Sequence, residues 1–397
     1  MAGNSRIAQH NRNTQLRKIQ GKKKSGEGRD YYDYNLLAAV ILLTCFGLVM
    51  LYSTSAYEAA VNYENDMFYF AKQAGISVLS LIMVLIVSQL DYHLFAKYSQ
   101  YVYVISVILL VLTKFIGREV NGAKRWIYFG PISFQPAEMA KLAVILFLPC
   151  VIVKTGRRIA ERKGMVQVCS VGGVAALCTY VFTENMSTAI IIAGITAVLV
   201  FIAHPRTAPF VAAAGVVVIF ALVMVWLASS SSLTGGSFRL RRIMVWLDPE
   251  AHPSEGGYQV MQGLYAIGSG GFFGKGLGNS TQKLGALPEA QNDMIFSIIC
   301  EELGVFGAAM VILLFVFLLY RLFFIAQNAP DLLGSLIASG IFVHIALQVV
   351  LNIAVVINLI PTTGITLPFV SYGGTSILFL MAEMAVALSI SKRIEFK

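Results

Sequence analysis

The stretch STAIIIAGITAVLVFIAH, residues 187–204, decides the fold class of this chain. It runs for 18 residues without an Asp, Glu, Lys or Arg. A helix that crosses the hydrocarbon core of a bilayer needs about 20 predominantly apolar residues. The stretch therefore predicts a membrane-spanning helix.

Similar stretches lie on both sides of it. The preceding one ends at Thr183-Glu184-Asn185-Met186, which predicts a very tight turn between two spans. The ten spans that the apolar pattern predicts are 35–54, 70–90, 96–116, 135–153, 166–183, 187–204, 208–228, 292–320, 333–358 and 372–391.

The composition agrees with this pattern. Of the 397 residues, 57% are apolar and 13% are charged, whereas soluble globular proteins carry about 25% charged residues. A water-soluble enzyme is thereby excluded. We expect an all-α polytopic membrane protein with about ten transmembrane helices, in a single transmembrane domain over 35–393.

The basic residues predict the orientation. The formal net charge is +9, and eight of the 30 Lys and Arg residues lie in a polar tail over 1–34, which we expect to be a disordered cytoplasmic segment. That tail either sets the topology or binds a partner. With both termini in the cytoplasm, the inner loops carry 19 basic residues and the outer loops eight, as the positive-inside rule requires. The net charge thus predicts no nucleic-acid partner.

One long outer loop, over about 229–291, separates the seventh and eighth spans. Its glycine-rich part, residues 266–283, matches no nucleotide-binding motif, because Lys275 is followed by Gly276. Backbone N–H groups together with Lys275 and Lys283 could cradle a lipid diphosphate. A flexible lid is the alternative.

Two further polar sites lie at or inside the predicted spans. Glu138 and Lys141 are three residues apart on one helix face, after a helix start at Pro136. Ionisable groups within a span are costly and usually functional. The pair either places a reacting group or is a structural ion pair between helices.

Asp293 lies where the long loop re-enters the membrane. Partial desolvation there should raise the pKa of its carboxyl group, which suits a general base. A helix N-cap is the alternative. Glu301 and Glu302, two turns further on, are expected to brace neighbouring helices.

Two outer turns complete the candidates. Glu184 and Asn185 either line a polar cavity or form a plain turn. Residues 361–376 contain two prolines and three glycines at membrane depth, which predicts a broken or re-entrant segment lining a cavity.

At these residues the chain resembles the SEDS family of bacterial cell-wall glycosyltransferases, over about 33–393. The FtsW/SpoVE branch is more similar than the RodA branch. The motifs that carry the resemblance are NGAKRW (121–126), FQPAEMAK (134–141), GYQVMQGLYAIGSGGFFGKGLGNSTQK (257–283), LPEAQNDMIFSIICEELG (287–304) and PTTGITLPFVSYGGTS (361–376).

The resemblance implies polymerisation of lipid II into glycan strands at the outer face of the cytoplasmic membrane, at the division septum. It implies lipid II and undecaprenyl-diphosphate-linked glycan as substrates. The implied protein partners are a class B penicillin-binding protein transpeptidase and membrane proteins of the divisome. A sporulation-specific polymerase is an alternative within the same family.

The resemblance also implies site residues. Asp293 matches the aspartate to which the family's catalysis is assigned, and Glu138 and Lys141 match a motif carboxylate and lysine. We expect Asp293, Glu138 and Lys141 to be the catalytic residues. Asn185 stands where many members have an aspartate, so an acidic role there is in doubt unless Glu184 substitutes. The residues expected to bind substrate are Lys124, Arg125, Trp126, Gln135, Asn185, Lys275, Asn279, Gln282, Lys283, Glu289 and Ser371.

The chemistry of this transfer needs three things. A base must take the proton of the acceptor sugar 4-hydroxyl, cations must stabilise the departing diphosphate, and the lipid tails need a groove open to the bilayer. Arg and Lys side chains or a divalent cation, Mg²⁺ or Mn²⁺, could stabilise the diphosphate, and the sequence predicts no dedicated metal ligands. A lipid II flippase is the rival class, kept open by His344 and Glu383 deep in the ninth and tenth spans. A non-catalytic scaffold for division proteins is the third.

Overall fold

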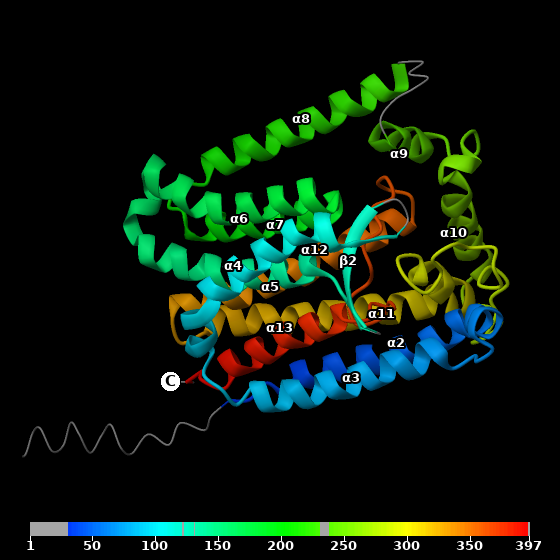
Figure 1. The fold of residues 1–397 in the computed structure, drawn as a ribbon, viewed down its shortest axis with the longest axis horizontal. Helices are drawn as coiled ribbons and strands as arrows, with labels where there is room; N and C mark the ends of the chain where they lie inside the picture. Colours follow the sequence, from blue (N-terminus) through cyan, green and yellow to red (C-terminus); the bar gives the residue numbers. More distant parts are fainter. Residues whose placement is uncertain (1–30, 121–122, 131, 231–237, 396–397) are drawn as a thin grey trace, which may run out of the picture.

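The computed structural model describes residues 31–120, 123–130, 132–230 and 238–395. The predicted tail over 1–34 lies mostly outside these residues, and so does the stretch 231–237 of the long loop. Within them the chain is an all-α bundle with one small β-sheet (Figure 1).

The ten predicted spans correspond to ten helices. Nine of the described helices are long and apolar enough to cross a membrane, and α13 is shorter, at 16 residues. The prediction of a polytopic helical membrane protein is confirmed. The bounds are α2 Tyr34–Tyr63, α3 Phe68–Val87, α4 Tyr92–Ile116, α5 Pro136–Thr155, α6 Arg162–Thr183, α7 Met186–Ala203, α8 Ala208–Ser230, α11 Ile295–Asn328, α12 Leu332–Val356 and α13 Ser376–Ser391.

Helix starts follow the local chemistry of the sequence. Asp33, Asn185 and Asp331 cap α2, α7 and α12, because each side chain accepts a hydrogen bond from a backbone N–H in the first turn. Pro136 occupies the first turn of α5, where a missing N–H costs nothing. The tight turn predicted between the fifth and sixth spans is confirmed, since α6 ends at Thr183 and α7 begins at Met186.

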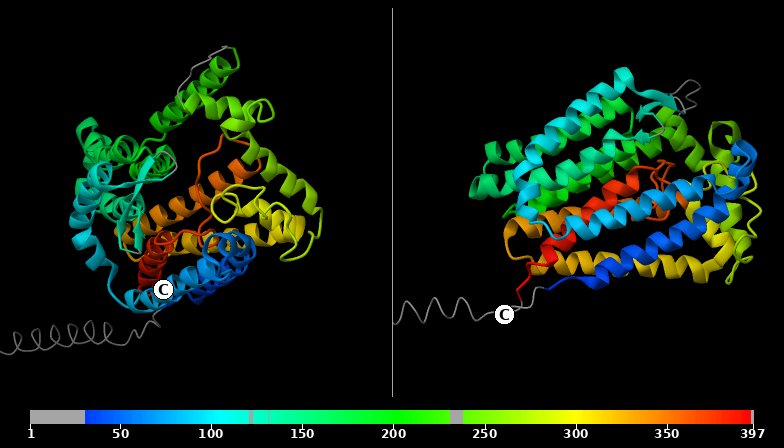
Figure 2. Two further views of the ribbon diagram at one scale, coloured as in Figure 1. Left: turned by 45° about the vertical axis from the view of Figure 1, so that its right-hand side comes forward. Right: turned by 60° about the horizontal axis from the view of Figure 1, so that its bottom comes forward.

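The helices differ in how much protein surrounds them. α5 and α12 are the most buried spans, whereas the apolar segment of α8 is not buried at all. Figures 1 and 2 show α8 standing apart from the rest of the bundle. Its apolar side chains, such as Val217 and Phe220, are exposed in the isolated chain, which suits a helix surrounded by lipid.

A three-stranded antiparallel sheet precedes α5, in the order β1-β2-β3. The strands are β1 Arg118–Val120, β2 Ala123–Phe129 and β3 Ile132–Phe134. Gly130 adopts a φ of +63° between β2 and β3, a conformation that disfavours other residues. The loop pattern alone did not predict this sheet, which fixes the direction of the β2 side chains.

The stretch 229–291, predicted as one long outer loop, contains regular helices in its described part. α8 continues to Ser230, and two further helices follow, α9 Phe238–Leu247 and α10 Gly257–Gly270, with a 3-10 turn, η2 Pro253–Glu255, between them. The buried residues of α10, Val260, Gly263 and Ala266, recur at helical spacing. A Cβ at Gly263 would collide with Met294, so α10 lies very close to the start of α11.

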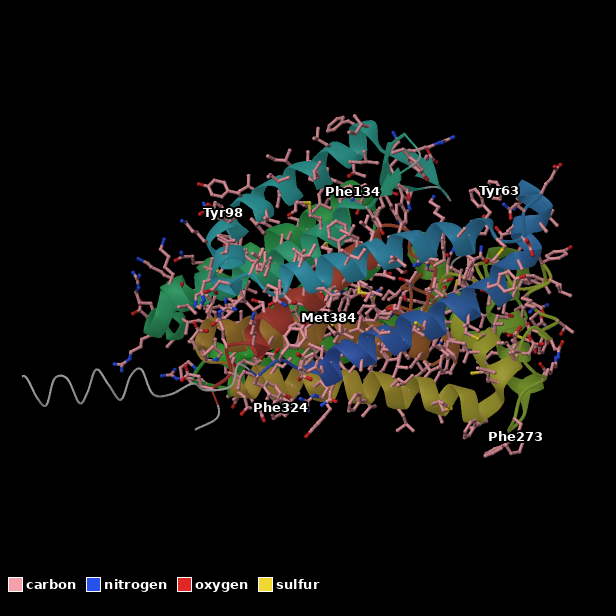
Figure 3. The ribbon with its side chains drawn as sticks, turned by 90° about the horizontal axis from the view of Figure 1, so that it is seen from below. Tyr63, Tyr98, Phe134, Phe273, Phe324 and Met384 are labelled. Carbon is pink, nitrogen blue, oxygen red and sulfur yellow. The ribbon has the colours of Figure 1, made fainter. Side chains whose placement is uncertain are left out.

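The irregular parts of the chain gather at one end of the bundle. We call it the loop end; it carries the β-sheet, α9, α10 and residues 271–294, and the opposite, terminal end carries the first described residues and the C-terminus (Figure 1). Figure 3 places Tyr63 and Phe273 at the loop end and Phe324 towards the terminal end. The candidate residues in these segments therefore lie at the same end of the bundle.

Candidate active site at the loop end

The segment between α12 and α13, residues 357–375, is non-helical, and we call it the strap. This confirms the predicted break. Unpaired backbone carbonyls at membrane depth are costly, and side chains from three helices satisfy four of them. The donors and distances are Arg242 to Thr362 O (3.0 Å), Ser187 to Thr363 O (2.5 Å), Asn352 to Ile365 O (2.7 Å) and Gln348 to Thr366 O (3.1 Å).

Asp293 lies beside the strap. Gly364 adopts a φ of +70°, and a Cβ at this position would lie 3.8 Å from Asp293 Oδ2. The other carboxylate oxygen, Oδ1, is buried and has no hydrogen-bond partner among the described residues. The cap of α11 is Met294, without a side-chain cap bond, so the carboxylate is not used as a helix cap.

The surroundings of Asp293 favour the protonated carboxyl group. Burial, followed by the negative charge of Glu289, raises the pKa of Asp293 to about 7. The positive charge of Arg242 acts in the opposite direction. A carboxylate with this pKa can accept a proton near neutral pH.

One arginine brings positive charge to Asp293, and a second arginine lies near the first. Arg242 on α9 interacts electrostatically with Asp293 and with Arg125 on β2, and burial lowers the pKa of both guanidinium groups. Arg125 donates to the carbonyl oxygen of Glu184 (3.4 Å), while its Nε has no partner in the described part of the chain. Two partly desolvated guanidinium groups next to each other suit a ligand with two phosphates.

Arg242 is missing from the site residues that the sequence predicted. The only signal for it was the excess of basic residues in the outer loops, because α9 itself was not predicted. Its side chain contacts the strap because α9 lies at the loop end (Figure 1).

The alternation of β2 separates the three residues predicted there. Successive side chains of a strand point to opposite faces. Arg125 shares one face with the buried Ala123 and Ile127, whereas Lys124 and Trp126 lie on the other, and Lys124 is exposed. Of the three, Arg125 is the one that interacts electrostatically with Arg242.

The glycine-rich loop does surround an anion, but that anion is a side chain of the protein. Lys275 Nζ lies 2.7 Å from Glu301 Oε1, and Lys283 Nζ lies 2.7 Å from Glu302 Oε1. Both glutamates are fully buried. The ion pairs explain how Glu301 and Glu302 brace the loop against α11.

Other groups of the same loop donate further hydrogen bonds to Glu301 or stabilise the loop itself. The backbone N–H groups of Thr281 and Gln282 and the hydroxyl of Ser280 donate to Glu301. Asn279 donates to the carbonyl oxygen of Lys275 (3.1 Å). A break in α11 at Gly304 (φ +67°) leaves carbonyls of that helix to accept the N–H groups of residues 275 and 276. Lys275, Asn279, Gln282 and Lys283 thus make contacts within the protein.

Glu138 and Lys141 form a buried ion pair of 2.9 Å. Lys141 also donates to Gln348 Oε1 (3.4 Å), and Gln348 in turn holds the strap. Neither member of the pair makes a hydrogen bond or ion pair with Asp293. The pair therefore connects to the strap through Gln348.

Two of the other predicted residues, Asn185 and Ser371, stabilise the backbone through their side chains, and Gln135 does not. Asn185 Oδ1 caps α7 by accepting from Thr188 N (3.0 Å). The Ser371 hydroxyl accepts from Leu367 N (2.8 Å) inside the strap. Gln135 precedes α5, and its side chain makes no cap bond.

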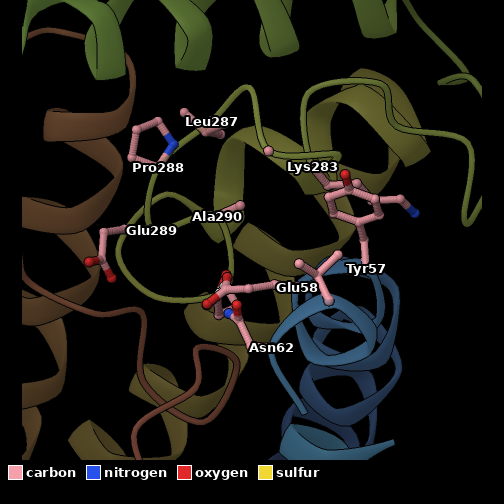
Figure 4. A pocket seen from close by; sticks show the side chains of 11 residues that line it. Tyr57, Glu58, Asn62, Lys283, Leu287, Pro288, Glu289 and Ala290 are labelled. Atoms are coloured by element: carbon pink, nitrogen blue, oxygen red, sulfur yellow. Dashed lines mark hydrogen bonds between the residues drawn. The ribbon is translucent and has the colours of Figure 1, made fainter. Parts of the chain in front are cut away.

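A cavity opens beside Glu289, between the outer turn of α2 and residues 283–291. Its volume is about 230 Å³. Figure 4 shows Glu289 on one side of it and Glu58 and Asn62 on the other. Both polar and apolar side chains line this hollow, which could hold part of a sugar or peptide beside Glu289.

A separate buried pair lies deep in the bundle. His344 Nδ1 and Glu383 Oε2 are 2.8 Å apart, and both side chains are 1% exposed. The pair joins α12 to α13 and makes no contact with the groups around Asp293.

Within the described ranges, no three His, Cys, Asp or Glu side chains come together as a set that could hold a metal ion. Mg²⁺ usually needs only one or two carboxylates together with substrate phosphates.

Comparison with known proteins places this geometry in a family. The model of the FtsW/RodA/SpoVE family of cell cycle proteins matches residues 33–395. Stage V sporulation protein E of Bacillus subtilis is 39% identical over 368 residues, covering 91% of this chain and 97% of that protein.

Two further similarities agree. The probable peptidoglycan glycosyltransferase FtsW of Trichlorobacter lovleyi is 37% identical over 362 residues, covering 91% of this chain and 93% of that protein. A solved chain of a peptidoglycan synthase complex, which coordinates polymerization and crosslinking, superimposes with a TM-score of 0.73 at 28% identity. The superposition covers 92% of this chain and 99% of the solved chain.

Proposed function

The chain belongs to the FtsW/RodA/SpoVE family of cell cycle proteins, and from this premise we propose that it is a peptidoglycan glycosyltransferase that polymerises lipid II into glycan strands. The observation that carries the proposal is Asp293, a carboxylate with a pKa of about 7 at the loop end of a membrane bundle. Arg242 acts on it electrostatically, and a cavity opens beside its neighbour Glu289.

Asp293 is the general base in this proposal. The 4-hydroxyl oxygen of the acceptor sugar attacks the anomeric carbon of the donor, and the bond between that carbon and the diphosphate oxygen breaks. The hydroxyl proton passes to Asp293. Base catalysis of this kind is worth about 10²–10⁴-fold in rate, and the diphosphate leaves with its negative charge.

Arg125 and Arg242 stabilise that leaving group. Both guanidinium groups are partly desolvated, and Arg242 interacts electrostatically with both Arg125 and Asp293, so charge that develops on the diphosphate meets fixed positive charge. A divalent cation bound with the diphosphate would add further positive charge at the same place.

Glu138 and Lys141 act indirectly in this scheme. Their ion pair holds Gln348, which donates to the strap carbonyl of Thr366. The pair thus supports the strap against which Asp293 lies, and we assign it a positioning role.

The loop end faces the outside of the cytoplasmic membrane in this proposal, with both termini in the cytoplasm. The charge bias of the loops supports this orientation. The transferred sugars are external and the donor is already activated, so no nucleotide is needed. A class B penicillin-binding protein is the proposed partner, because the similar solved chain belongs to a peptidoglycan synthase complex. The division septum is the proposed site of action.

The similarity to stage V sporulation protein E supports a second setting for the same activity, in spore formation. Depletion in growing cells and in sporulating cells separates the two. A septation defect would indicate division, and a defect confined to spores would indicate sporulation.

The purified protein with labelled lipid II in liposomes tests the proposal. We expect glycan strands that lysozyme digests. Movement of lipid II between leaflets without strand formation would instead support a flippase, for which the deep His344–Glu383 pair is the available feature.

A further inference from the structure

Asn352 connects the backbone of Asp293 to the strap. It lies on α12, with 1% of its surface exposed. Its Nδ2 donates to the backbone carbonyl oxygen of Asp293 (2.8 Å) and to that of Ile365 (2.7 Å). Both protons of one amide nitrogen are thereby used by two segments that are far apart in sequence.

The orientation of this amide is determined by its partners. If oxygen and nitrogen were exchanged, Asn352 Oδ1 would face two carbonyl oxygens, which repel it. Oδ1 itself has no hydrogen-bond partner among the described residues. The two carbonyl oxygens therefore require a nitrogen that carries two N–H donors. An aspartate or a leucine of similar size has neither donor.

The strap also receives Arg242, which donates to Thr362 O. The carbonyl of Ile365, held by Asn352, lies three residues further along the strap. Asn352 thus fixes the backbone at Asp293 and the strap, whose Thr362 carbonyl accepts from Arg242, to the same helix. Placement of this kind matters, because a misplacement of about 1 Å can cost about 10²-fold in rate.

We propose that Asn352 is a positioning residue for the transfer reaction, which sets the place of the Asp293 carboxylate against the strap and Arg242. The inference rests on the proposed role of Asp293 as the base. Asn352 itself touches neither substrate nor reacting atoms.

The test compares Asn352→Leu with the wild-type protein in the lipid II polymerisation assay. Leucine has a similar shape but no donor. We expect kcat to fall about 100-fold while KM for lipid II changes less than about 3-fold, because the binding groups remain. In the pH profile of kcat, the fall on the acid side, which we call the acid limb, reports the pKa of Asp293. We also expect this limb to lie at a different pH in the variant, since the carboxylate has moved relative to Glu289 and Arg242. A loss of folded protein alone would move neither KM nor the limb.

Asn328→Leu is the matched control. Asn328 donates to a backbone carbonyl, that of Phe324, at the same 2.8 Å, but it is exposed at the terminal end. We expect wild-type kcat and an unchanged limb for this variant.

A kcat for Asn352→Leu within about 3-fold of wild type would overturn the inference, and so would a lower kcat with an unmoved limb. If Asn352→Leu does not fold, Asn352→Ser, which keeps one O–H donor, replaces it. A kcat lowered about 10-fold with a shifted limb supports the inference, and a wild-type kcat and limb overturn it.

Asp293→Asn is measured alongside. If Asp293→Asn is active, the proposed base is wrong; if it is inactive while Asn352→Leu behaves as wild type, only the inference about Asn352 fails.

Discussion

Lys275 Nζ lies 2.7 Å from Glu301 Oε1, inside a loop whose glycines and N–H groups could equally have held a phosphate. The carboxylate of Glu301 occupies the place of that ligand. The loop is therefore an internal clasp between residues 275–283 and α11, joined to α2 through Ser53, which contacts both Lys283 and Glu302.

The first prediction concerns the stability that this clasp provides. Lys283→Met leaves the fully buried Glu302 without its cation, and breaking a buried pair costs about 3–5 kcal/mol. Thermal unfolding in detergent should show a clear fall in Tm. Lys275→Met should cost less, because the Lys275 side chain is 32% exposed.

Lys97→Met, an exposed lysine at the terminal end, is the control and should leave Tm unchanged. The double variant Lys283→Met, Glu302→Gln removes both charges and should recover part of the lost stability. An unchanged Tm with a raised KM for lipid II would mean that the lysines bind the substrate diphosphate instead.

The second prediction separates support from chemistry at the Glu138–Lys141 pair. Lys141→Met leaves Glu138 unpaired in the bundle, so stability and kcat should both fall. The double variant Lys141→Met, Glu138→Gln carries no unpaired charge and should regain most of the Tm and most of the kcat. Recovery of Tm with no recovery of kcat would show that one of the two residues reacts directly.

The third prediction is the pH dependence. With a pKa of about 7, Asp293 loses its ability to accept a proton as the pH falls through neutrality, so kcat should fall there. The charge of Glu289 raises this pKa. Glu289→Gln should therefore lower the pKa of Asp293 and move the acid limb to lower pH.

Arg242→Gln gives the opposite sign. The positive charge of Arg242 lowers the pKa of Asp293, so its removal should move the limb to higher pH. The variant should also lower kcat/KM by about 10–100-fold, because hydrogen bonds to charged groups contribute about 1.5–3 kcal/mol. Shifts of the same sign in both variants would exclude Asp293 as the titrating group, and complete inactivity of Glu289→Gln would point to Glu289 as the base.

The fourth prediction is the topology. In a variant without the five native cysteines, Ser254→Cys on η2 should react with a membrane-impermeant maleimide added to intact cells. Arg157→Cys, in the turn between α5 and α6, should react only after the membrane is opened. The reverse labelling pattern would place the loop end, and with it Asp293, in the cytoplasm.

Much of the fold could be predicted because a bilayer imposes a simple rule on sequence. Long apolar runs separated by polar turns predict helices, and the turn at Glu184 and Asn185 follows directly from two abutting runs. The sheet, α9 and α10 were missed for the opposite reason. Their segments are too short to give a membrane-spanning apolar pattern, and tertiary packing, such as the close approach of Gly263 to Met294, determines their structure.

The candidate site shows the same division. Asp293 and the broken strap could be predicted, because a carboxylate and proline-glycine backbone are costly at membrane depth. The roles of Lys275 and Lys283 could not, since a glycine-rich loop has the same sequence pattern whether it holds a phosphate or a glutamate. Arg242 and Asn352 act through long-range contacts, with separations of 120 and 59 residues from Thr362 and Asp293. No local sequence pattern indicates contacts between residues so far apart in the chain.

The most direct test of the central claim is the rate of lipid II polymerisation by Asp293→Asn. Asparagine keeps the shape of the side chain but cannot accept the proton, so the rate should fall by about 10²–10⁴-fold. Because the raised pKa shows that burial disfavours the charged carboxylate, Tm at neutral or alkaline pH should be equal to or higher than that of the wild type. Polymerisation by Asp293→Asn at close to the wild-type rate would contradict the account.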